Sequence, residues 1–431
     1  LKKELRCLIM QKNRRLIMTK EIFDGYKYIE GGVCAAKGFV ANGLNCGINP
    51  VKEKFDLGVV YSEKECNAAG VYTQNKVKGA PIIVTKKHLE KSGGKAKAVI
   101  VNSKNANTCN ADGEEIAEKV SELLADAIGI KPEEVIVAST GVIGQRLSVK
   151  PFEDYMQQLV DGMTADGHTA AADAIMTTDT VRKEVAVEFE IDGKVCHLGG
   201  MAKGSGMIHP NMATTLNFVT TDTAISSEMV QKALSEIVKI TYNCLSIDGD
   251  TSTNDMVSVM ANGLAGNKEI VAEDENYEKF KKALYIVMSN MTKMLAADGE
   301  GASKLLECTC CGAPDMETAI IVAKSVIRSP LFKCAMFGED ANWGRILCAI
   351  GYAEAEFDIS KVSVSLRSEV GSVKVCENGA GVEFSEDEAA KLLAKDEIFI
   401  DINLGQGEAS AKAWGCDLTY DYVKINGDYR S

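Results

Sequence analysis

The sequence is poor in histidine, proline and long apolar runs, and each scarcity narrows the choice of function. Its 431 residues include 4 His and 7 Pro. With so few imidazoles, a Ser-His-Asp triad has little support, and the zinc-protease pattern His-Glu-x-x-His is absent. No apolar run reaches the roughly 18 residues that a membrane-spanning helix needs. The net charge of −13 argues against nucleic acid or an anionic membrane surface as a partner.

Cysteine is plentiful, but its distribution does not resemble a disulfide framework. The 14 Cys are scattered over a long chain with no secretory signal, so we expect free thiols in a reducing, cytoplasmic setting. The one cluster is Cys308-Thr309-Cys310-Cys311, with no second Cys or His pair close in sequence. Alternation of small thiols on a strand is therefore favoured there, and no metal is expected.

The length favours two domains or two interlocked lobes over a single core. Residues 1–17 are rich in Lys and Arg and carry one acid, Glu4. A transit peptide has this composition, but the pattern favours an extension upstream of a start at Met18, outside the fold.

Short β-prone runs separated by Gly and Asn fill the first hundred residues, and a helix with apolar residues at helical spacing follows. A further strand leads into Ser139-Thr140-Gly141, a turn that would present backbone N–H groups at a sheet edge. The predicted strands here are residues 58–61, 70–72, 81–84, 98–101 and 135–138, and the helix is 114–129.

The rest of the chain also mixes strands and helices. Asp192-Gly193 between two apolar runs predicts a hairpin over 185–198. Helices are predicted around 230–237, over 277–297 and from a capping box at Ser385, and strands at 362–366, 373–375, 398–402 and 419–423. This mixed order predicts an α+β fold, a layered sandwich rather than a regular βαβ winding.

The central stretch from Lys203 to Leu216 combines glycines, a lysine and Pro210-Asn211 just before Ala213-Thr214, and then becomes apolar. If the Ala213-Thr214 bond is cleaved, Thr214 gains a free α-amine beside its own hydroxyl, which pairs a nucleophile with a base. The unperturbed pKa of such an amine is about 7.7–8.0, so no histidine is needed. The alternative is that Thr214 simply begins a strand.

Several long motifs, in order, resemble the ornithine acetyltransferase family, the glutamate N-acetyltransferases of arginine biosynthesis. The resemblance spans roughly residues 27–431. It rests on residues 203–214, on Ser139-Thr140-Gly141-Val142-Ile143-Gly144, and on 176–180, 248–255, 298–302, 338–345 and 416–426.

The resemblance implies a self-cleaving enzyme with a layered fold of the N-terminal-nucleophile-like type. Cleavage at Ala213-Thr214 would give an α chain, 18–213, and a β chain, 214–431, assembled as an α2β2 heterotetramer. Thr214 would carry an acetyl group from N2-acetyl-L-ornithine to L-glutamate. No cofactor is implied, although acetyl-CoA is a further acyl donor if the enzyme is bifunctional.

The same resemblance assigns roles residue by residue. Thr140 and Gly141 correspond to the family's oxyanion hole. The substrate-binding positions correspond to Thr177 or Thr178, Lys203, Thr214, Glu300, Asn426 and the terminal Ser431.

Departures from the family pattern are Lys104, where glycine is common, His209, where alanine is common, and Thr215, where methionine is common. One alternative is an N-terminal-nucleophile aminopeptidase or amidohydrolase, in which water accepts the acyl group. Another is an uncleaved binding protein without catalytic activity.

Overall fold

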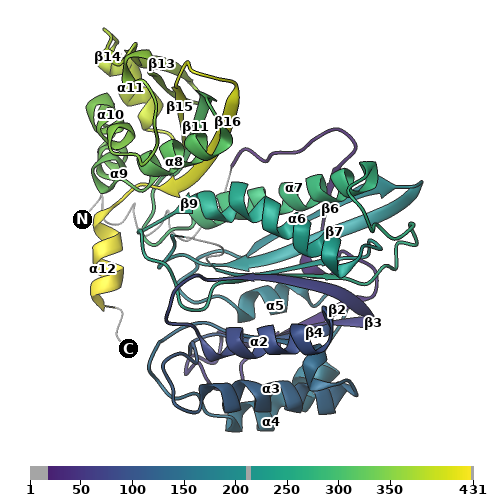
Figure 1. The fold of residues 1–431 in the computed structure, drawn as a ribbon. Helices are drawn as coiled ribbons and strands as arrows, with labels where there is room; N and C mark the ends of the chain where they lie inside the picture. The colour runs from purple at the N-terminus through teal and green to yellow at the C-terminus, as the bar shows by residue number, and fades with distance from the viewer. Residues whose placement is uncertain (1–17, 210–214, 429–431) are drawn as a thin grey trace.

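The chain folds into two lobes, each built on one mixed β-sheet (Figure 1). The computed structural model describes residues 18–209 and 215–428. In the first lobe the strand order is β1-β6-β7-β8-β10-β3-β4-β5, with β2 also paired to β3. In the second lobe the order is β14-β13-β12-β15-β11-β16-β9. An α+β layered arrangement with two lobes is therefore confirmed.

The strands of the first sheet are β1 Lys27–Ile29, β2 Phe39–Leu44, β3 Leu57–Tyr72, β4 Lys95–Asn102, β5 Val135–Ser139, β6 Lys183–Ile191, β7 Lys194–Lys203, β8 Leu216–Thr221 and β10 Met256–Ala261. Those of the second are β9 Leu245–Ser246, β11 Leu305–Ala313, β12 Ser363–Ser368, β13 Gly371–Glu377, β14 Ala380–Gly381, β15 Glu397–Asn403 and β16 Ala409–Cys416. The helices are α2 Ala80–Lys91, α3 Gly113–Ile128, α4 Lys150–Asp161, α5 His168–Ala174, α6 Ser227–Ile240, α7 Glu275–Ala297, α8 Met316–Ile327, α9 Pro330–Phe337, α10 Trp343–Gly351, α11 Glu386–Leu393 and α12 Tyr420–Asp428. Single 3-10 turns cover Gly32–Cys34, Pro132–Glu134, Tyr242–Cys244 and Ile359–Lys361.

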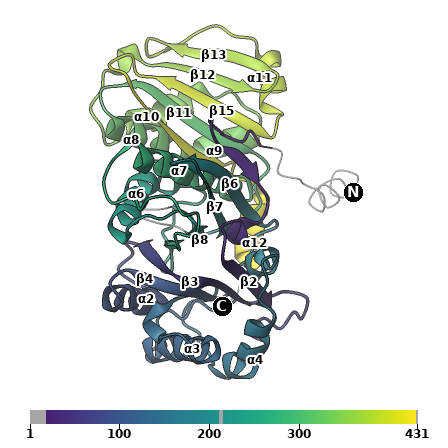
Figure 2. The same ribbon diagram turned by 90° about the vertical axis from the view of Figure 1, so that its right-hand side faces the viewer.

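Helices cover both faces of the first sheet. α6 and α7 pack on one side, against β3, β6 and β7, and α5 packs on β2 and β3 from the other (Figures 1 and 2). α2 packs on β5, and α3 and α4 follow as an outer layer. No helix in the described parts of the chain is long and apolar enough to cross a bilayer.

The register around β8 aligns three chain segments at one sheet edge. Lys203, the last residue of β7, pairs with Leu216, the first of β8, and Leu216 pairs with Met256, the first of β10. Side chains at or just before these positions therefore meet, although they lie far apart in sequence.

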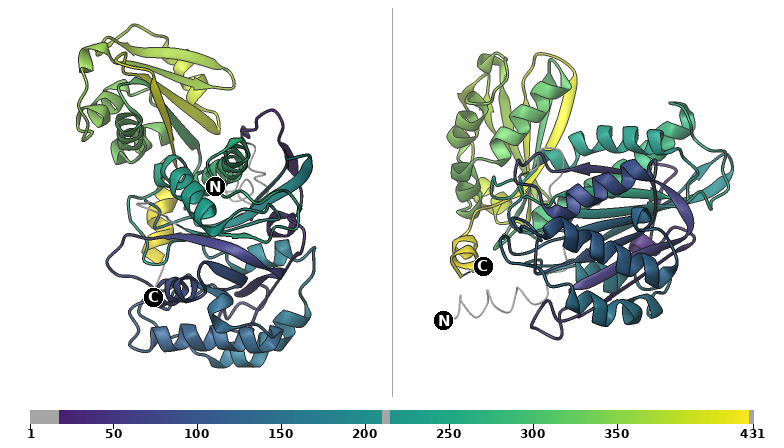
Figure 3. Two further views of the ribbon diagram at one scale, coloured as in Figure 1. Left: turned by 45° about the vertical axis from the view of Figure 1, so that its right-hand side comes forward. Right: turned by 60° about the horizontal axis from the view of Figure 1, so that its bottom comes forward.

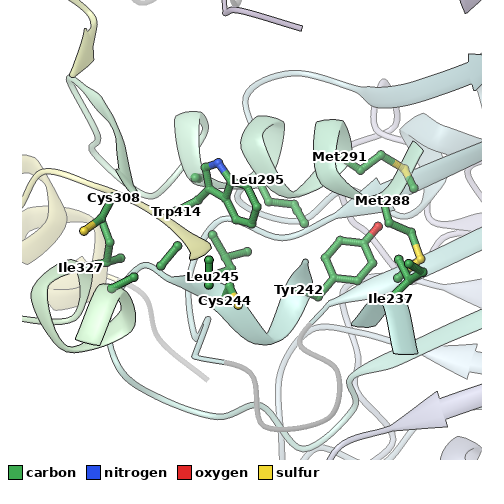
Figure 4. Close-up of a cluster of buried hydrophobic side chains, with 14 of the residues drawn as sticks. Ile237, Tyr242, Cys244, Leu245, Met288, Met291, Leu295, Cys308, Ile327 and Trp414 are labelled. Atoms are coloured by element: carbon green, nitrogen blue, oxygen red, sulfur yellow. The ribbon is translucent and has the colours of Figure 1, made fainter. Parts of the chain in front are cut away.

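The buried core continues from one lobe into the other through α7. This helix is buried along most of its length, and Trp414 of β16 packs near Leu245 and Leu295 (Figure 4). The fully buried indole of Trp414 donates its N–H to Glu307 at 2.9 Å, which satisfies the polar atom. Because α7 belongs to both lobes, we expect them to unfold together.

Most predicted elements are confirmed. The hairpin turns at Asp192 and Gly193, whose φ angles of 52° and 70° fit a type I′ turn. The helix predicted from Ser385 forms as α11, and the Ser385 hydroxyl caps it by accepting the Glu388 amide at 3.3 Å. The predicted strands 58–61 and 70–72 are parts of the single strand β3.

Two predicted strands are wrong. Residues 81–84 form the first turn of α2, where Pro81 is tolerated because a first-turn residue needs no amide partner. Residues 420–423 form the first turn of α12, a helix with no buried residue, in which Tyr420 and Val423 are exposed. Aromatic and β-branched residues suggested a strand there, but no neighbouring strand is available to pair with it.

Candidate active site

A small polar cavity lies where β7 ends and β8 and β10 begin. Its volume is about 20 Å³, room for roughly one water molecule. We call it the Lys203 cavity. It is lined by Thr140, Lys203, Gly204, Gly206, Met207, Ile208, Thr215, Leu216, Ser252, Asn254 and Asp255.

Lys203 and Thr140 meet directly in this cavity. The buried Lys203 Nζ donates to Thr140 Oγ1 at 3.1 Å. The Thr140 hydroxyl proton remains available to a third atom, because the oxygen is the acceptor in this contact.

The turn after β5 gives Thr140 and Gly141 their positions. Gly141 has φ +132°, a conformation that residues with a side chain rarely adopt, and a Cβ there would overlap the backbone of Lys104. Both observations require glycine at this position. Among the described residues, none accepts the Gly141 N–H. The turn therefore offers a hydroxyl and a backbone amide, the donor types from which oxyanion holes are built.

Asn254 joins this turn to the loop before β10. Its side-chain nitrogen donates to the carbonyls of Ala106 and Ser139 at 2.6 and 2.9 Å, and its oxygen accepts from Thr108 at 2.6 Å. Because Asn254 is buried and its amide is satisfied, the oxyanion-type donors sit on a rigid support.

Lys104 occupies the left-handed region with φ 75°, where glycine is favoured. This backbone conformation fits the glycine that the resemblance led us to expect at that position.

A buried charge cluster lies behind Lys203. Lys183 Nζ contacts Asp179 and Asp298, each at 2.6 Å. Asp179 also accepts the Gly204 amide at 2.7 Å and the Thr177 amide at 3.0 Å. Burial alone would raise the pKa of Asp179, but Lys183, Lys203 and the Gly204 amide outweigh it and hold the pKa below its usual value. Asp179 thus ties Thr177 to the segment that carries Lys203.

Lys203 itself is under opposing influences. Burial lowers its pKa, while the carboxyls of Asp179 and Asp255 act in the opposite direction. Burial also raises the pKa of Asp255 well above the ordinary value, against the effect of Lys203. The cavity therefore holds one amine and one carboxyl whose charges depend on each other.

Glu300, in the loop after α7, lies beside Gly206 of the cavity wall and meets Asn426 of the second lobe. Asn426 of α12 donates to Glu300 Oε2 at 2.7 Å. Helix α12 follows β16 of the second sheet and lies beside the first lobe in both views of Figure 3. Tyr422 extends the contact by donating to Asp248 at 3.3 Å.

Gly206 allows Glu300 to approach. A Cβ on Gly206 would lie 2.5 Å from the Glu300 carboxyl carbon, so any side chain there would displace the carboxylate. Asp248 holds the same segment by accepting the amides of Met207 and Ile208 at 2.6 and 2.7 Å.

His209 is a neutral loop residue. Burial, with Lys324 and Arg328 nearby, lowers its pKa to about 4. Its Nδ1 lies 3.0 Å from the Ser246 hydroxyl. This environment suits a hydrogen-bonded structural role.

The structure brings Thr140, Gly141, Thr177, Lys203, Glu300 and Asn426 into one region. Thr178 is half-buried beside Thr177. Ala213, Thr214, Ser431 and residues 1–17 lie outside the described residues. Thr215, which does lie within them, has φ 145°, a backbone region that is strained for any residue with a side chain.

Sequence reasoning assigned no role to Asp179, Asp255 or Asp298, although each lies within a motif that carried the family resemblance. The sequence signal that could have found them is the presence of an aspartate inside each of these motifs. Their importance depends on burial and on partners far away in sequence, which only the fold reveals.

A much larger hollow lies elsewhere on the described surface. It measures about 850 Å³ and is lined mainly by residues near Tyr26, Phe189 and α7. None of the predicted site residues borders it. We favour the Lys203 cavity because several polar groups converge there.

Among the described residues, no group of three or more His, Cys, Asp or Glu side chains is arranged to hold a metal ion. Cys308 and Cys310 face the core from β11, as the alternation predicted.

Comparison with known proteins identifies the family. The model of the ArgJ family matches residues 40–431. The chain belongs to the ArgJ family. It is 50% identical over 394 residues to arginine biosynthesis bifunctional protein ArgJ 1 of Clostridium acetobutylicum, covering 91% of this chain and 96% of the relative. The ArgJ protein of Caldanaerobacter subterraneus is 46% identical over 404 residues, 94% of this chain and 99% of that one.

Two solved structures are similar in sequence. ArgJ of Bacillus halodurans is 45% identical with a TM-score of 0.47, covering 49% of this chain and 98% of that one. An ornithine acetyltransferase of Mycobacterium tuberculosis, solved with ornithine, is 36% identical with a TM-score of 0.40, covering 44% and 100%. The family model and the two curated relatives confirm the family resemblance: the chain is an acyltransferase of arginine biosynthesis with glutamate N-acetyltransferase activity.

Proposed function

We propose that the enzyme cleaves itself between Ala213 and Thr214 and then uses Thr214 as its nucleophile. The observation that supports this proposal is the convergence of Lys203, Thr140 and Thr215 on one cavity, since Thr215 follows Thr214 in the sequence. The strained φ angle of Thr215 adds support, because strain beside a bond favours its rearrangement.

Cleavage begins when the Thr214 hydroxyl attacks the Ala213 carbonyl. The C–N bond breaks as the ester C–O bond forms, and the hydroxyl proton passes to the departing amine. Water then hydrolyses the ester, leaving a carboxylate on Ala213 and a free amine and hydroxyl on Thr214. In this proposal Thr140 and the Gly141 amide stabilise the oxyanion in these steps.

Acetyl transfer reuses the same groups. The Thr214 hydroxyl attacks the acetyl carbonyl of N2-acetyl-L-ornithine, with its own α-amine as base, and L-ornithine leaves with a proton. The amine of L-glutamate then attacks the acetyl-threonine ester. N-acetyl-L-glutamate leaves, and the hydroxyl is restored.

The charged groups around the cavity match such substrates. Lys203 is suited to a substrate carboxylate, and Glu300, held by Asn426, to a substrate ammonium group. Thr177 or Thr178 and the terminal Ser431 complete the proposed binding set. We also propose an α2β2 assembly in the cytoplasm. Acetyl-CoA is a second acyl donor if the enzyme is bifunctional.

Intact mass spectrometry of the purified protein, with and without N2-acetyl-L-ornithine, tests the proposal. The expected result is two fragments that join at Ala213/Thr214, with one acetyl mass added to the fragment that begins at Thr214. A single uncleaved species without an adduct would refute both the nucleophile and the cleavage site.

Omitting glutamate tests the hydrolytic alternative. A transferase releases ornithine catalytically only when glutamate is present, beyond one equivalent per enzyme. Continuous release without glutamate would indicate that water accepts the acyl group, as in an aminopeptidase or amidohydrolase.

A further inference from the structure

The hydrogen bond between Lys203 and Thr140 has a direction that restricts where the Thr140 hydroxyl proton can point. Both residues are buried, at 9% and 8% exposure, and Lys203 Nζ lies 3.1 Å from Thr140 Oγ1. A lysine ammonium has three N–H donors and no acceptor, so the Thr140 oxygen can only accept in this contact. The hydroxyl proton must therefore point away from Lys203.

The groups around Lys203 favour the charged form that this argument needs. Burial opposes the charge, but the carboxyls of Asp179 and Asp255 face the amine and favour it. Asp179 is itself held as a carboxylate by Lys183 at 2.6 Å and by the Gly204 amide at 2.7 Å. An ammonium that donates to a hydroxyl also polarises it, which makes the remaining O–H a stronger donor.

The backbone of Thr140 is fixed by contacts that do not involve Lys203. The Thr140 amide donates to the Asn102 carbonyl at 2.9 Å, and the Ser139 hydroxyl donates to the Asn102 side chain at 2.6 Å. The Ser139 carbonyl accepts from Asn254 at 2.9 Å. The contact from Lys203 is therefore not needed to place the turn, and what it adds is a fixed orientation of the hydroxyl.

The fold itself offers the Thr140 proton no acceptor. Within residues 18–209 and 215–428, the one hydrogen bond of the Thr140 hydroxyl is the bond from Lys203. Both side chains line the Lys203 cavity, which has a volume of about 20 Å³ and room for roughly one water-sized group. An oxygen atom that enters this cavity would meet an O–H donor whose direction is already set.

We propose that Lys203 is a positioning residue that holds the Thr140 hydroxyl with its proton directed into the Lys203 cavity, where it can donate to an oxygen that gains negative charge. This inference rests on the proposed function, in which Thr140 stabilises the oxyanion. Lys203 acts through Thr140, and neither side chain forms a covalent bond or transfers a proton. The role is additional to binding a substrate carboxylate, because the ammonium has two further N–H groups.

The two roles of Lys203 predict different kinetics. Binding a substrate carboxylate stabilises the bound substrate and the transition state alike, so its loss raises KM. Positioning of the Thr140 hydroxyl matters only when the oxyanion forms, so its loss lowers kcat. Self-cleavage of the precursor involves no substrate carboxylate, and only the positioning role affects its rate.

The first test is a double-mutant cycle on kcat for acetyl transfer from N2-acetyl-L-ornithine. Lys203→Met removes the donor, and Thr140→Val removes the hydroxyl while keeping the shape of the side chain. We expect kcat to fall about 10- to 30-fold in Lys203→Met and about 10²- to 10³-fold in Thr140→Val. The double variant should match Thr140→Val within about threefold, because Lys203 then has no hydroxyl to hold. Independent roles would multiply the two losses.

The second test times self-cleavage during cell-free synthesis with a labelled amino acid, from the loss of the full-length band on a gel. We expect Lys203→Met to slow cleavage by about tenfold or more. The matched control is Lys304→Met, because Lys304 is 7% exposed and donates to a neutral oxygen, the Leu393 carbonyl, at 2.6 Å. This variant should lose stability but keep the wild-type cleavage rate and kcat.

A further variant keeps the inference testable if Lys203→Met does not fold. Lys203→Gln retains an N–H donor without the positive charge. It should lose less kcat than the methionine variant, and its loss should again fail to multiply with that of Thr140→Val.

The outcomes separate this inference from the proposed function. A wild-type protein that stays uncleaved and forms no acetyl adduct, or a Thr140→Val variant with wild-type kcat, would refute the proposed function. A slow Thr140→Val variant, together with a Lys203→Met variant that raises only KM or cleaves at the wild-type rate, would overturn this inference alone. Multiplied losses in the double variant would do the same. So would a lower yield of folded Lys203→Met with unchanged kcat per folded molecule, because that result indicates a purely structural lysine.

Discussion

Replacing Lys183 with methionine should leave two buried carboxylates without their shared cation. Lys183 and Asp179 have fully buried side chains, Asp298 is 5% exposed, and both ion pairs measure 2.6 Å. Removing one partner from a buried ion pair typically costs about 3–5 kcal/mol. Asp179 keeps the Gly204 and Thr177 amides and stays near Lys203, so we expect the lower half of that range, about 3–4 kcal/mol.

The stability that Lys183→Met loses should also depend on pH, and it should be larger at high pH than at low pH. In the wild type the folded pKa of Asp179 lies below the unfolded value of about 3.9, so its stabilisation is present above that pH and is lost only in stronger acid. Without Lys183, burial favours the protonated acid and raises the folded pKa. The difference in stability between wild type and Lys183→Met should therefore shrink as the pH falls from 8 towards 4.

Urea unfolding followed by circular dichroism at pH 8 and pH 5 measures both quantities. The control is Lys150→Met, which breaks an exposed i,i+4 pair with Asp154 and should change the free energy of unfolding very little. The double variant Lys183→Met/Asp298→Asn should recover part of the loss, since it removes one uncompensated charge. A loss below about 1 kcal/mol, or one that is independent of pH, would refute the reasoning.

Three further outcomes are expected. Gly206→Ala should displace Glu300, and steady-state assays should show the KM for N2-acetyl-L-ornithine raised about tenfold at nearly constant kcat. An unchanged KM would contradict the placement of Glu300. Thr140→Val should lower kcat by about 10²–10³ while the melting temperature stays close to that of the wild type. Between about pH 6.5 and 4 the unfolded chain protonates His209, whereas the folded chain, in which its pKa is about 4, does not, so the wild type loses stability as the pH falls. His209→Gln removes this proton uptake and should reduce the loss of unfolding free energy over that pH range. A wild-type-like acid loss in that variant would assign the effect to other groups.

Sequence reasoning worked best where the local pattern is decisive. The turn at Asp192-Gly193 predicted its hairpin because both residues accept a positive φ. It failed at Pro81, where a short apolar run fits a strand or the first turn of a helix equally well, and at α12, where propensity conflicted with the absence of a partner strand. Lys203, Glu300 and Asn426 were predicted as site residues from motifs, but their juxtaposition depends on strand register and on a helix from the other lobe. The roles of Asp179 and Asp255 follow from burial, which no local pattern encodes.

The strand order of the first sheet has a consequence for the kinetics of assembly. Strands β8 and β10 follow the proposed cleavage point, and they lie between β7 on one side and β3 on the other, both of which precede it. A cut at Ala213/Thr214 would therefore leave two pieces that cannot separate unless the sheet opens along both edges of the inserted pair. The intact precursor can fold in a unimolecular reaction, whereas the processed enzyme, once denatured, would have to reassemble from separate fragments at a rate that falls with dilution.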